Sequence, residues 1–388
     1  MRVCLDLSVL SSRPTGVGYY GYFLGKALLE QFADAEHYVA FDGLRFAGLK
    51  SRLDDFARRS SVKSSLNQFV WQTTAANSLL RSAWRRVKAV AFARGLSRCD
   101  LVHAISYGPP ARASTPWIPL ITDLSHRRVP QFHPEERVRW LEAQDARIDD
   151  SALINTISEF TKSEVVSLLG VDPARVRVTY PGVDPIYAQL RPEDALTVAR
   201  FGLTEGRYLL TVGAIDPRKN LETIAVAFAR LPQPVRRDCV LLFAGQPGWG
   251  RVDFPAIAAP LRDRGEIRFI GYVSSDELRA LYRYAALFLY PSHYEGFGIP
   301  VAEAHLAGAP VAIAKGSGAQ EAACGLAEEI AANDIDGWSA LMRRALEGEA
   351  WRDLQAREAR TASARAFTWE RNAALTHEIY NEVARCLR

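Results

Sequence analysis

Tyr290-Pro-Ser-His-Tyr-Glu-Gly-Phe-Gly-Ile-Pro-Val-Ala-Glu303 is the stretch around which the rest of the chain is organised. The apolar run 285–289 before it has the length of a buried strand, and Pro291 cannot continue a central ladder. A glycine-punctuated turn follows at 295–298, and Pro300 suits the first position of a helix. A helix that begins there offers free N–H groups and a positive dipole end, which favour a phosphate. We therefore predict a strand, a tight loop and a helix start that form an anion site.

Two carboxylates flank this turn. Glu295 lies in the loop, and Glu303 lies eight positions later in the predicted first turn of the helix. Gly296 and Gly298 would let a ligand approach the main chain closely. The helix dipole alone favours a carboxylate near a helix start, so a structural role for Glu303 stays open.

The surrounding pattern Pro-Ser-x-x-Glu-Gly-Phe-Gly-x-Pro-x-x-Glu-Ala resembles the E-x7-E signature of the retaining glycosyltransferases of family 4, also called glycosyl transferases group 1. This resemblance implies an α/β GT-B fold, with two doubly wound Rossmann-like domains, a cleft between them, and a C-terminal helix that crosses back to the first domain. The expected limits are 1–188 for the acceptor-side domain, 189–368 for the nucleotide-sugar domain, and 369–388 for the helix.

Length and composition fit two soluble domains. The chain has 388 residues, of which 48% are hydrophobic and 24% charged. Its five scattered cysteines lack a Cys-x-x-Cys pair, which indicates a reducing compartment rather than a disulfide framework or a zinc site. The first residues read as a strand and not as a signal peptide, and no apolar run is long enough to span a bilayer. We expect a cytoplasmic protein, and the net charge of +4 gives no indication of a nucleic-acid partner.

A first glycine-containing loop lies between the predicted strand 2–10 and the predicted helix 19–31. It carries Gly16 and Gly18 but lacks the full Gly-x-Gly-x-x-Gly fingerprint. The family resemblance implies that these two glycines reach the phosphates and the sugar of a donor.

A second loop of this kind follows the predicted strand 208–213 and contains Arg218 and Lys219. These cations could clamp a diphosphate, because Arg offers a bidentate fork and Lys a point charge. A solvated surface loop is the alternative. Many family members carry Arg directly after the glycine, where this chain has Ala214, and Arg218 is the candidate that replaces it.

Asp123 and His126 follow the predicted strand 118–122 in a segment that resembles the acceptor-side Asp-Leu-Ser of the family. Relatives often have His before the Asp, but this chain has Thr122. Which of Asp123 and His126 faces the reacting centre therefore stays open, and either could be structural. His103, inside a strand, is predicted to be a packed core residue.

The resemblance also implies the donor contacts. Glu295 would bind hydroxyls of the donor sugar, Glu303 the nucleotide ribose, and the main chain at Val273 the nucleobase. The amides of the turn would bind the diphosphate, which adds Gly296, Phe297, Gly298 and Ile299 to the site. Glu295 and Glu303 are thus not read as the acid and nucleophile of a glycoside hydrolase. No metal ion and no cofactor are expected, since the nucleotide sugar is a substrate.

A basic amphipathic helix is predicted at residues 79–98. Apolar residues such as Val87, Val90 and Ala91 recur at helical spacing, and Arg81, Arg85 and Lys88 lie on another face. Such a helix can lie on an anionic membrane, which would make the protein peripheral to the inner face of the cell membrane. A core-facing helix with a solvated basic face is the alternative.

The function implied by the resemblance is retaining transfer of a hexose to a glycan or polyprenyl-linked acceptor in surface polysaccharide assembly. GDP-mannose is our choice of donor, although the sequence names neither the sugar nor the acceptor. Two alternatives stay open: a non-transferase GT-B enzyme such as a nucleotide-sugar epimerase, and a catalytically silent sugar-nucleotide-binding subunit.

Overall fold

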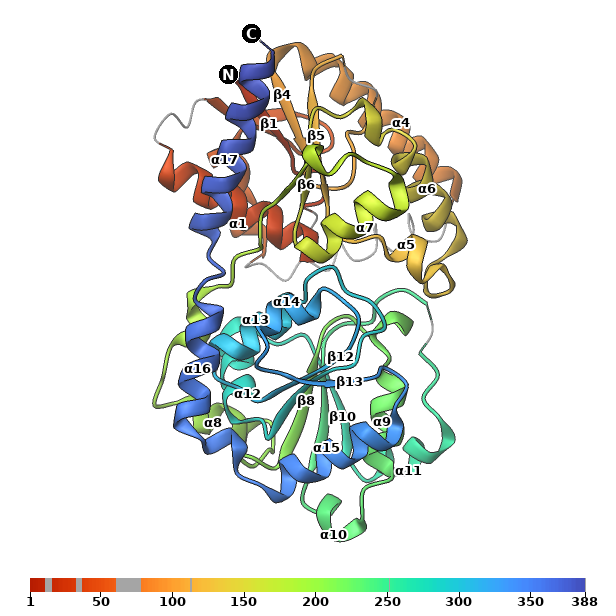
Figure 1. Ribbon diagram of the computed structural model, residues 1–388, viewed down its shortest axis with the longest axis vertical. Coiled ribbons are helices and arrows are strands. Elements are labelled where there is room, and N and C mark those ends of the chain that lie inside the picture. Colours follow the sequence, from red (N-terminus) through yellow and green to blue (C-terminus); the bar gives the residue numbers. More distant parts are fainter. Residues whose placement is uncertain (11–15, 33–36, 61–77, 112–113, 251, 388) are drawn as a thin grey trace. The chain divides into compact units, whose positions relative to one another are not determined.

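The structure is a computed structural model that describes residues 1–10, 16–32, 37–60, 78–111, 114–250 and 252–387. The chain packs into two compact units, each built on its own sheet (Figure 1). Unit 1 comprises Met1–Thr122, Trp140–Gly182 and Trp369–Arg388, and unit 2 comprises Asp123–Arg139 and Val183–Thr368.

Within the described ranges, unit 1 has a seven-stranded sheet in the order β3-β2-β1-β4-β5-β6-β7. Only β3 runs antiparallel to its neighbour. The strands are β1 Val3–Asp6, β2 Tyr38–Phe41, β3 Phe46–Gly48, β4 Leu101–Ala104, β5 Trp117–Ile121, β6 Ile154–Thr156 and β7 Val176–Val178. The helices are α1 Gly16–Gln31, α2 Leu49–Ser60, α4 Ser78–Gly95, α7 Glu159–Leu169 and α17 Trp369–Cys386, and α6 Glu135–Asp145 has residues in both units.

Unit 2 has a parallel sheet whose strands, counted over the same described residues, are six in the order β10-β9-β8-β11-β12-β13. The strands are β8 Tyr208–Val212, β9 Val240–Ala244, β10 Ile267–Gly271, β11 Leu287–Tyr290, β12 Val311–Ala314 and β13 Glu328–Ile330. This is the doubly wound order, in which the strand order reverses between the parallel neighbours β8 and β11, and ligands bind at the carboxyl ends of the strands at that point.

Helices cover both faces of the unit 2 sheet (Figure 1). The helices of unit 2 are α5 Ser125–Arg128, α8 Asp194–Arg200, α9 Leu221–Ala229, α10 Gln233–Arg236, α11 Ala259–Asp263, α12 Ser275–Tyr284, α13 Ile299–Leu306, α14 Ala319–Ala323, α15 Ile335–Glu347 and α16 Leu354–Ala364. Leu209, Phe228, Phe243 and Trp338 belong to one buried cluster that joins the sheet to α9 and α15. The inner strands β8, β9, β11 and β12 are largely apolar runs, as expected where both faces of a sheet are buried.

The helices α7 and α15 each begin at a side-chain cap. The Ser158 hydroxyl accepts a hydrogen bond from the Thr161 amide at 2.9 Å, and Asp334 accepts one from Gly337 at 2.9 Å. His103 is also a core residue as predicted, since it is fully buried with Nδ1 2.7 Å from the Tyr380 hydroxyl.

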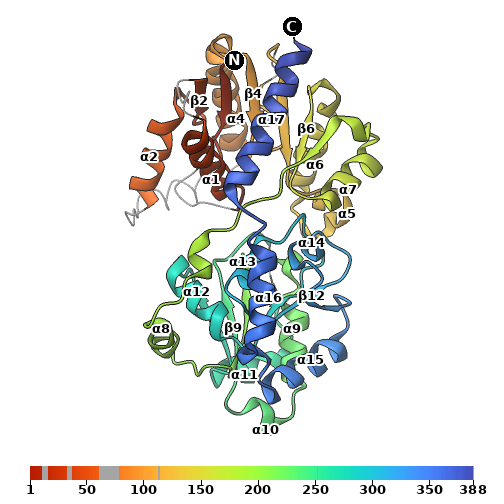
Figure 2. The ribbon, with the colours of Figure 1, turned by 60° about the vertical axis from the view of Figure 1, so that its left-hand side comes forward.

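The last helix, α17, packs against α1 of unit 1 (Figure 2). The Trp369 ring lies 5.3 Å from the Tyr20 ring and 5.4 Å from the Phe23 ring, centroid to centroid. Asn372 Nδ2 donates to the carbonyl oxygen of Tyr180 at 2.8 Å. The predicted return of the C-terminal helix to the first domain is therefore confirmed.

Two local predictions are corrected here or fall partly outside the residues that the structure describes. Gly16 and Gly18 lie in the first turn of α1 and not in a loop, because the helix begins three residues before Tyr19. The predicted basic helix 79–98 is found as α4 followed by a short 3-10 helix at Leu96–Arg98, and the side chains of 78–85, including Arg81 and Arg85, lie outside the described part. None of the described helices has both the length and the apolar character needed to cross a bilayer.

The segment Asp123–Arg139 packs with unit 2, although it precedes the predicted boundary at 188. Units 1 and 2 describe which parts of the folded chain pack together, and they do not show where an independently folding domain begins or ends. The limits 1–188, 189–368 and 369–388 therefore stay a prediction.

Candidate active site

The site begins where β8 ends. Gly213 has φ +142°, and a Cβ on Gly245, at the end of β9, would lie 1.8 Å from the Gly213 carbonyl oxygen. The absence of a side chain at Gly245 therefore allows the ends of β8 and β9 to approach each other. Loop 214–220 leaves this point and carries the predicted cations.

Polar contacts fix the loop around those cations. The Asp216 carboxylate accepts a hydrogen bond from the Arg218 amide at 3.1 Å. Asn220 has φ +54°, a left-handed conformation that Asn tolerates better than most residues. Its Nδ2 donates to the carbonyl oxygens of Pro291, at 3.1 Å, and Ala332, at 2.8 Å. The loop is thus anchored to the chain that follows β11.

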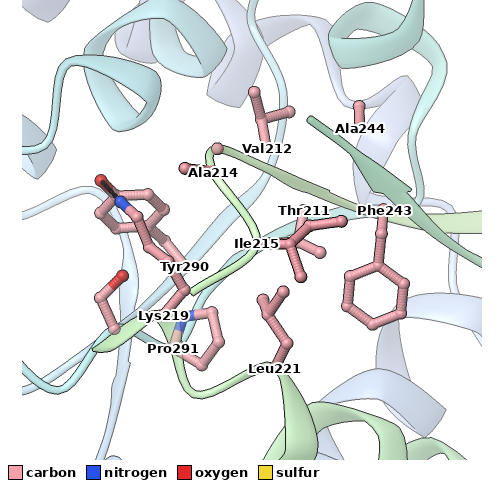
Figure 3. A pocket seen from close by; sticks show the side chains of 12 residues that line it. Thr211, Val212, Ala214, Ile215, Lys219, Leu221, Phe243, Ala244, Tyr290 and Pro291 are labelled. Atoms are coloured by element: carbon pink, nitrogen blue, oxygen red, sulfur yellow. Dashed lines mark hydrogen bonds between the residues drawn. The ribbon is translucent and has the colours of Figure 1, made fainter. Parts of the chain in front are cut away.

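The two cations converge on one carboxylate. Lys219 Nζ lies 2.6 Å and Arg218 Nη1 2.9 Å from Glu295 Oε1, and all three side chains are about nine-tenths buried. Arg218 also donates to the Tyr294 carbonyl oxygen at 2.6 Å. Lys219 donates to the Tyr290 hydroxyl at 3.1 Å and lies 4.8 Å from the centre of that ring (Figure 3).

These charges set the protonation of the site. Burial alone would raise the pKa of Glu295, but Arg218 and Lys219 lower it to about 2, so Glu295 is ionised throughout the physiological range. Burial raises the pKa of Asp216. Both cations are thus paired with an ionised carboxylate, and an anionic ligand would compete with Glu295 for them.

A cavity lies at the carboxyl end of β8, beside the cations (Figure 3). Its lining comes from residues 211–215, 243–244 and 290–292, with Lys219 and Leu221. Within the described residues, Ser292 Oγ, a buried polar atom of the lining, has no hydrogen-bond partner. Unmet polar atoms at a topological switch point are typical of a ligand site.

The turn of the central signature forms the neighbouring wall. Gly298 has φ +90° and precedes α13, and a Cβ there would lie 3.3 Å from Ala319. The Gly318 amide donates to the Glu295 carbonyl oxygen at 2.8 Å. Because α13 begins at Ile299, Glu303 is in the second turn of the helix and not in the first.

Glu303 lies in a cluster of its own. The Tyr282 hydroxyl donates to Glu303 Oε2 at 3.1 Å, and Tyr187 packs against Tyr282 with ring centres 5.9 Å apart. Burial raises the pKa of Glu303 to about 7; the Tyr282 hydrogen bond opposes this shift and Asp184 adds to it. Buried carboxylates with strongly raised pKa values are common at functional sites, so Glu303 is a candidate for hydrogen bonding to a polar ligand.

Asp123 is brought to the cations, because segment 123–139 packs with unit 2. Burial would raise its pKa, but Arg218 and the Ser125 hydrogen bond bring the pKa below the ordinary value. The Leu124 amide donates to the Tyr294 hydroxyl at 3.1 Å, next to Glu295. His126 is 1% exposed and lies in α5.

The remaining predicted residues are spread more widely. Val273 follows β10, at the carboxyl edge of the unit 2 sheet, whereas Gly16 and Gly18 belong to unit 1. Their donor contacts stay predictions. Sequence reasoning missed Tyr290 and Trp249, which contact Lys219 and Arg218 respectively. Tyr290 could have been found, since it ends the strand that leads into the signature.

Comparison with known proteins agrees with this geometry. The family model for glycosyl transferases group 1 matches residues 199–365, and that for Glycosyltransferase Family 4 matches residues 16–186. O-antigen chain mannosyltransferase B of Escherichia coli is 32% identical over 261 residues, which are 66% of this chain and 68% of that protein. D-inositol 3-phosphate glycosyltransferase of Nocardioides sp. is 32% identical over 268 residues, 64% of this chain and 57% of that protein.

The structure of HepE from Anabaena in complex with UDP-glucose has a similar fold, with a TM-score of 0.69 at 15% identity over 98% of this chain and 99% of that one. Two doubly wound units of this kind define an α/β protein of the GT-B class, as predicted. Within that class, the chain belongs to family 4 of the glycosyltransferases.

Proposed function

We propose that this glycosyltransferase moves a hexose from a nucleotide diphosphate sugar to a glycan or polyprenyl-linked acceptor, with retention at the anomeric carbon. The observation that carries the proposal is the buried pair Arg218 and Lys219, both held on Glu295 beside a cavity at the switch point. A diphosphate supplies the negative charge that this pair complements.

The donor would bind along the carboxyl edge of the unit 2 sheet. Arg218 and Lys219 would take the diphosphate, and the main chain of the Gly296–Ile299 turn would add amides and the α13 dipole. Glu295 would bind hydroxyls of the sugar, Glu303 the ribose, and the main chain at Val273 the base.

In the reaction, the bond between the anomeric carbon and the β-phosphate oxygen breaks, and negative charge develops on that oxygen. Arg218 and Lys219 are already oriented and nearly dry, so they would stabilise this charge without reorganisation. The acceptor hydroxyl attacks the face that the phosphate leaves, and its proton passes to the leaving phosphate. This scheme retains configuration and does not require a metal ion.

The names of similar proteins support the choice of donor sugar. The Escherichia coli relative is named an O-antigen chain mannosyltransferase, which favours GDP-mannose and surface polysaccharide assembly. The HepE complex contains UDP-glucose, which supports the wider class of nucleotide-sugar donors. Arg218 would take the place of the arginine that many relatives carry where this chain has Ala214, since it meets the same carboxylate as Lys219.

Contact with an anionic membrane through α4 is part of the proposal. Val87 is 49% and Val90 51% exposed, one helical turn apart, and Arg86 and Arg94 are exposed on the same helix. These valines do not face the core, which favours the membrane interpretation over the core-facing helix.

In liposome flotation with anionic lipids, an Arg85→Glu/Arg86→Glu variant should lose recovery, while an Arg343→Glu/Arg344→Glu control on α15 should float like the unaltered protein. If Arg85→Glu/Arg86→Glu is recovered as fully as the control variant, membrane contact through α4 is contradicted.

An assay with several donors tests the function. The protein is incubated with GDP-mannose, UDP-glucose or a dTDP-sugar, with and without a polyprenyl-diphosphate-linked glycan. We expect one donor to be consumed, and only when the acceptor is present. Donor breakdown that does not depend on the acceptor would instead support an epimerase-like GT-B enzyme, and donor binding without transfer would support a silent binding subunit.

A further inference from the structure

The loop 246–250, which follows β9, is fastened to the loop that carries Arg218. The Ile215 amide donates to the Gln246 carbonyl oxygen at 2.9 Å, and the Gly248 amide donates to the Ile215 carbonyl oxygen at 2.9 Å. A Cβ on Gly248 would lie 3.1 Å from the Asp216 Cβ, so the two loops are in close contact. The loop that carries Trp249 and the loop that carries Arg218 are therefore joined by two backbone hydrogen bonds.

Trp249, at the tip of this loop, binds the segment Asp123–Arg139. Its Nε1 donates to the Phe132 carbonyl oxygen at 2.9 Å. The His133 ring stacks on the indole with centres 5.5 Å apart and planes 23° apart, and the Arg137 guanidinium lies 5.0 Å from the ring centre. One side chain thus contacts three positions of the segment.

The same indole contacts the donor-side cation. The Arg218 guanidinium carbon lies 5.9 Å from the Trp249 ring centre, within the range of a cation–π interaction. A second attachment lies beside Glu295, where the Phe132 ring stacks on His293 at 4.8 Å with planes 9° apart. The segment is therefore attached at two points, through Trp249, which contacts Arg218, and through His293, which lies two residues before Glu295.

We propose that Trp249 is a positioning residue that couples Arg218 to the segment Asp123–Arg139. Asp123 and His126 then keep a fixed position relative to the cations instead of following the strand β5 from which the segment emerges. The catalytic meaning of this coupling rests on the proposed function, because that function makes Arg218 a donor ligand. The coupling itself is a property of the fold and can be measured without a substrate.

Hydrogen exchange followed by mass spectrometry tests the coupling. The reporters are the Phe132 and His133 amides, which donate to the carbonyl oxygens of Val129 and Pro130 at 3.0 Å. In Trp249→Ala, exchange of peptides covering 130–133 should rise by about tenfold, as expected when a hydrogen bond and two cation–π contacts are lost. Peptides from β8 and α13 should not change. Trp249→Phe retains the stacking but not the donor and should give a smaller rise.

Tyr272→Ala is the matched control, because Tyr272 is 68% exposed at the same edge of the sheet. It should leave exchange of 130–133 unaltered. If Trp249→Ala also leaves it unaltered, the proposal is overturned; a rise confined to Trp249→Ala and, to a smaller extent, Trp249→Phe supports it.

Kinetics provide the second measurement. Trp249→Ala should lower kcat at saturating donor by about tenfold and change the Kd for GDP or UDP by less than about threefold, because the cations stay on Glu295 while Asp123 is released. An equal loss in kcat and in nucleotide affinity would show that Trp249 only supports the donor site, which contradicts a role toward the segment. If the unaltered protein transfers no sugar at all, the proposed function fails, and the exchange experiment still decides the coupling.

Discussion

Lys219 Nζ lies 2.6 Å from Glu295 Oε1, although the two residues are 76 positions apart in the sequence. Arg218 reaches the same oxygen at 2.9 Å. Glu295 is therefore the internal counter-ion of both cations that we assign to the donor diphosphate. An anionic ligand must share these cations with Glu295 or displace it.

Lys219→Ala should lower turnover by at least about a hundredfold, because it removes one charge-stabilising donor from a water-poor site. The comparison is made at saturating donor in the acceptor-dependent assay. Lys315→Ala, an exposed lysine that follows β12, is the control and should retain turnover. Near-normal turnover of Lys219→Ala would refute its role at the diphosphate.

Glu295→Gln should bind a nucleoside diphosphate more tightly while turning over more slowly. Loss of the carboxylate leaves Arg218 and Lys219 without their counter-ion, so a diphosphate meets less competition for them. We expect a gain in affinity of about tenfold by calorimetry, in the range of one charge-assisted hydrogen bond. Weaker binding together with unaltered turnover would contradict the counter-ion role.

Glu303→Gln should make the protein more stable at pH 8. The pKa of Glu303 in the folded state is about 7, above its ordinary 4.5, chiefly because of burial. The folded protein thus retains a proton that the unfolded chain loses, and the free energy of unfolding falls as the pH rises from 4.5 to about 7. The full shift corresponds to up to about 3 kcal/mol.

Urea denaturation of the unaltered protein and Glu303→Gln at pH 4.5 and pH 8 measures this difference. The variant should gain stability relative to the unaltered protein only at the higher pH. A constant difference at both pH values would mean that Glu303 does not titrate in this interval. Glu303→Ala should also weaken nucleotide binding more than it slows turnover, and a defect in turnover alone would contradict the ribose assignment.

Gly298→Ala should destabilise unit 2 and weaken nucleotide binding. An alanine at φ +90° costs about 1–2 kcal/mol, and its Cβ would lie 3.3 Å from Ala319. Gly316→Ala is the control for the backbone cost alone, because Gly316 has φ +85° with no atom within 4 Å of its Cβ position. Equal stability and equal nucleotide affinity of the two variants would show that close packing at Gly298 is unimportant.

Local signals in the sequence predicted much of unit 2. Pro291 and Pro300 restrict the backbone and Gly298 permits a left-handed turn, so strand, turn and helix start could be predicted from them. The basic loop 214–220 was predicted from Gly213, because a glycine that ends a buried apolar run marks the end of a strand. The pairing of these loops through Glu295 could not be predicted from the residues themselves, because it depends on the order of β8 and β11 in the sheet.

Tertiary packing decided the points where sequence reasoning failed. Two glycines at the start of α1 disfavour a helix there, so the first turn of α1 was not predicted. The helix is instead held by close packing at Gly21, where a Cβ would lie 2.9 Å from the Leu7 side chain. The packing of segment 123–139 with unit 2 includes contacts with Trp249, which lies in a loop whose composition gave no indication of a partner.

Calorimetric titration of GDP, UDP and dTDP into the unaltered protein, Lys219→Ala and Lys315→Ala tests the assignment of the donor site most directly. We predict that at least one nucleotide binds the unaltered protein and Lys315→Ala equally well, and binds Lys219→Ala at least about tenfold more weakly, because a charge-assisted contact is lost. Failure of all three nucleotides to bind the unaltered protein, or equal affinity for Lys219→Ala, would contradict a nucleotide diphosphate sugar held by this lysine.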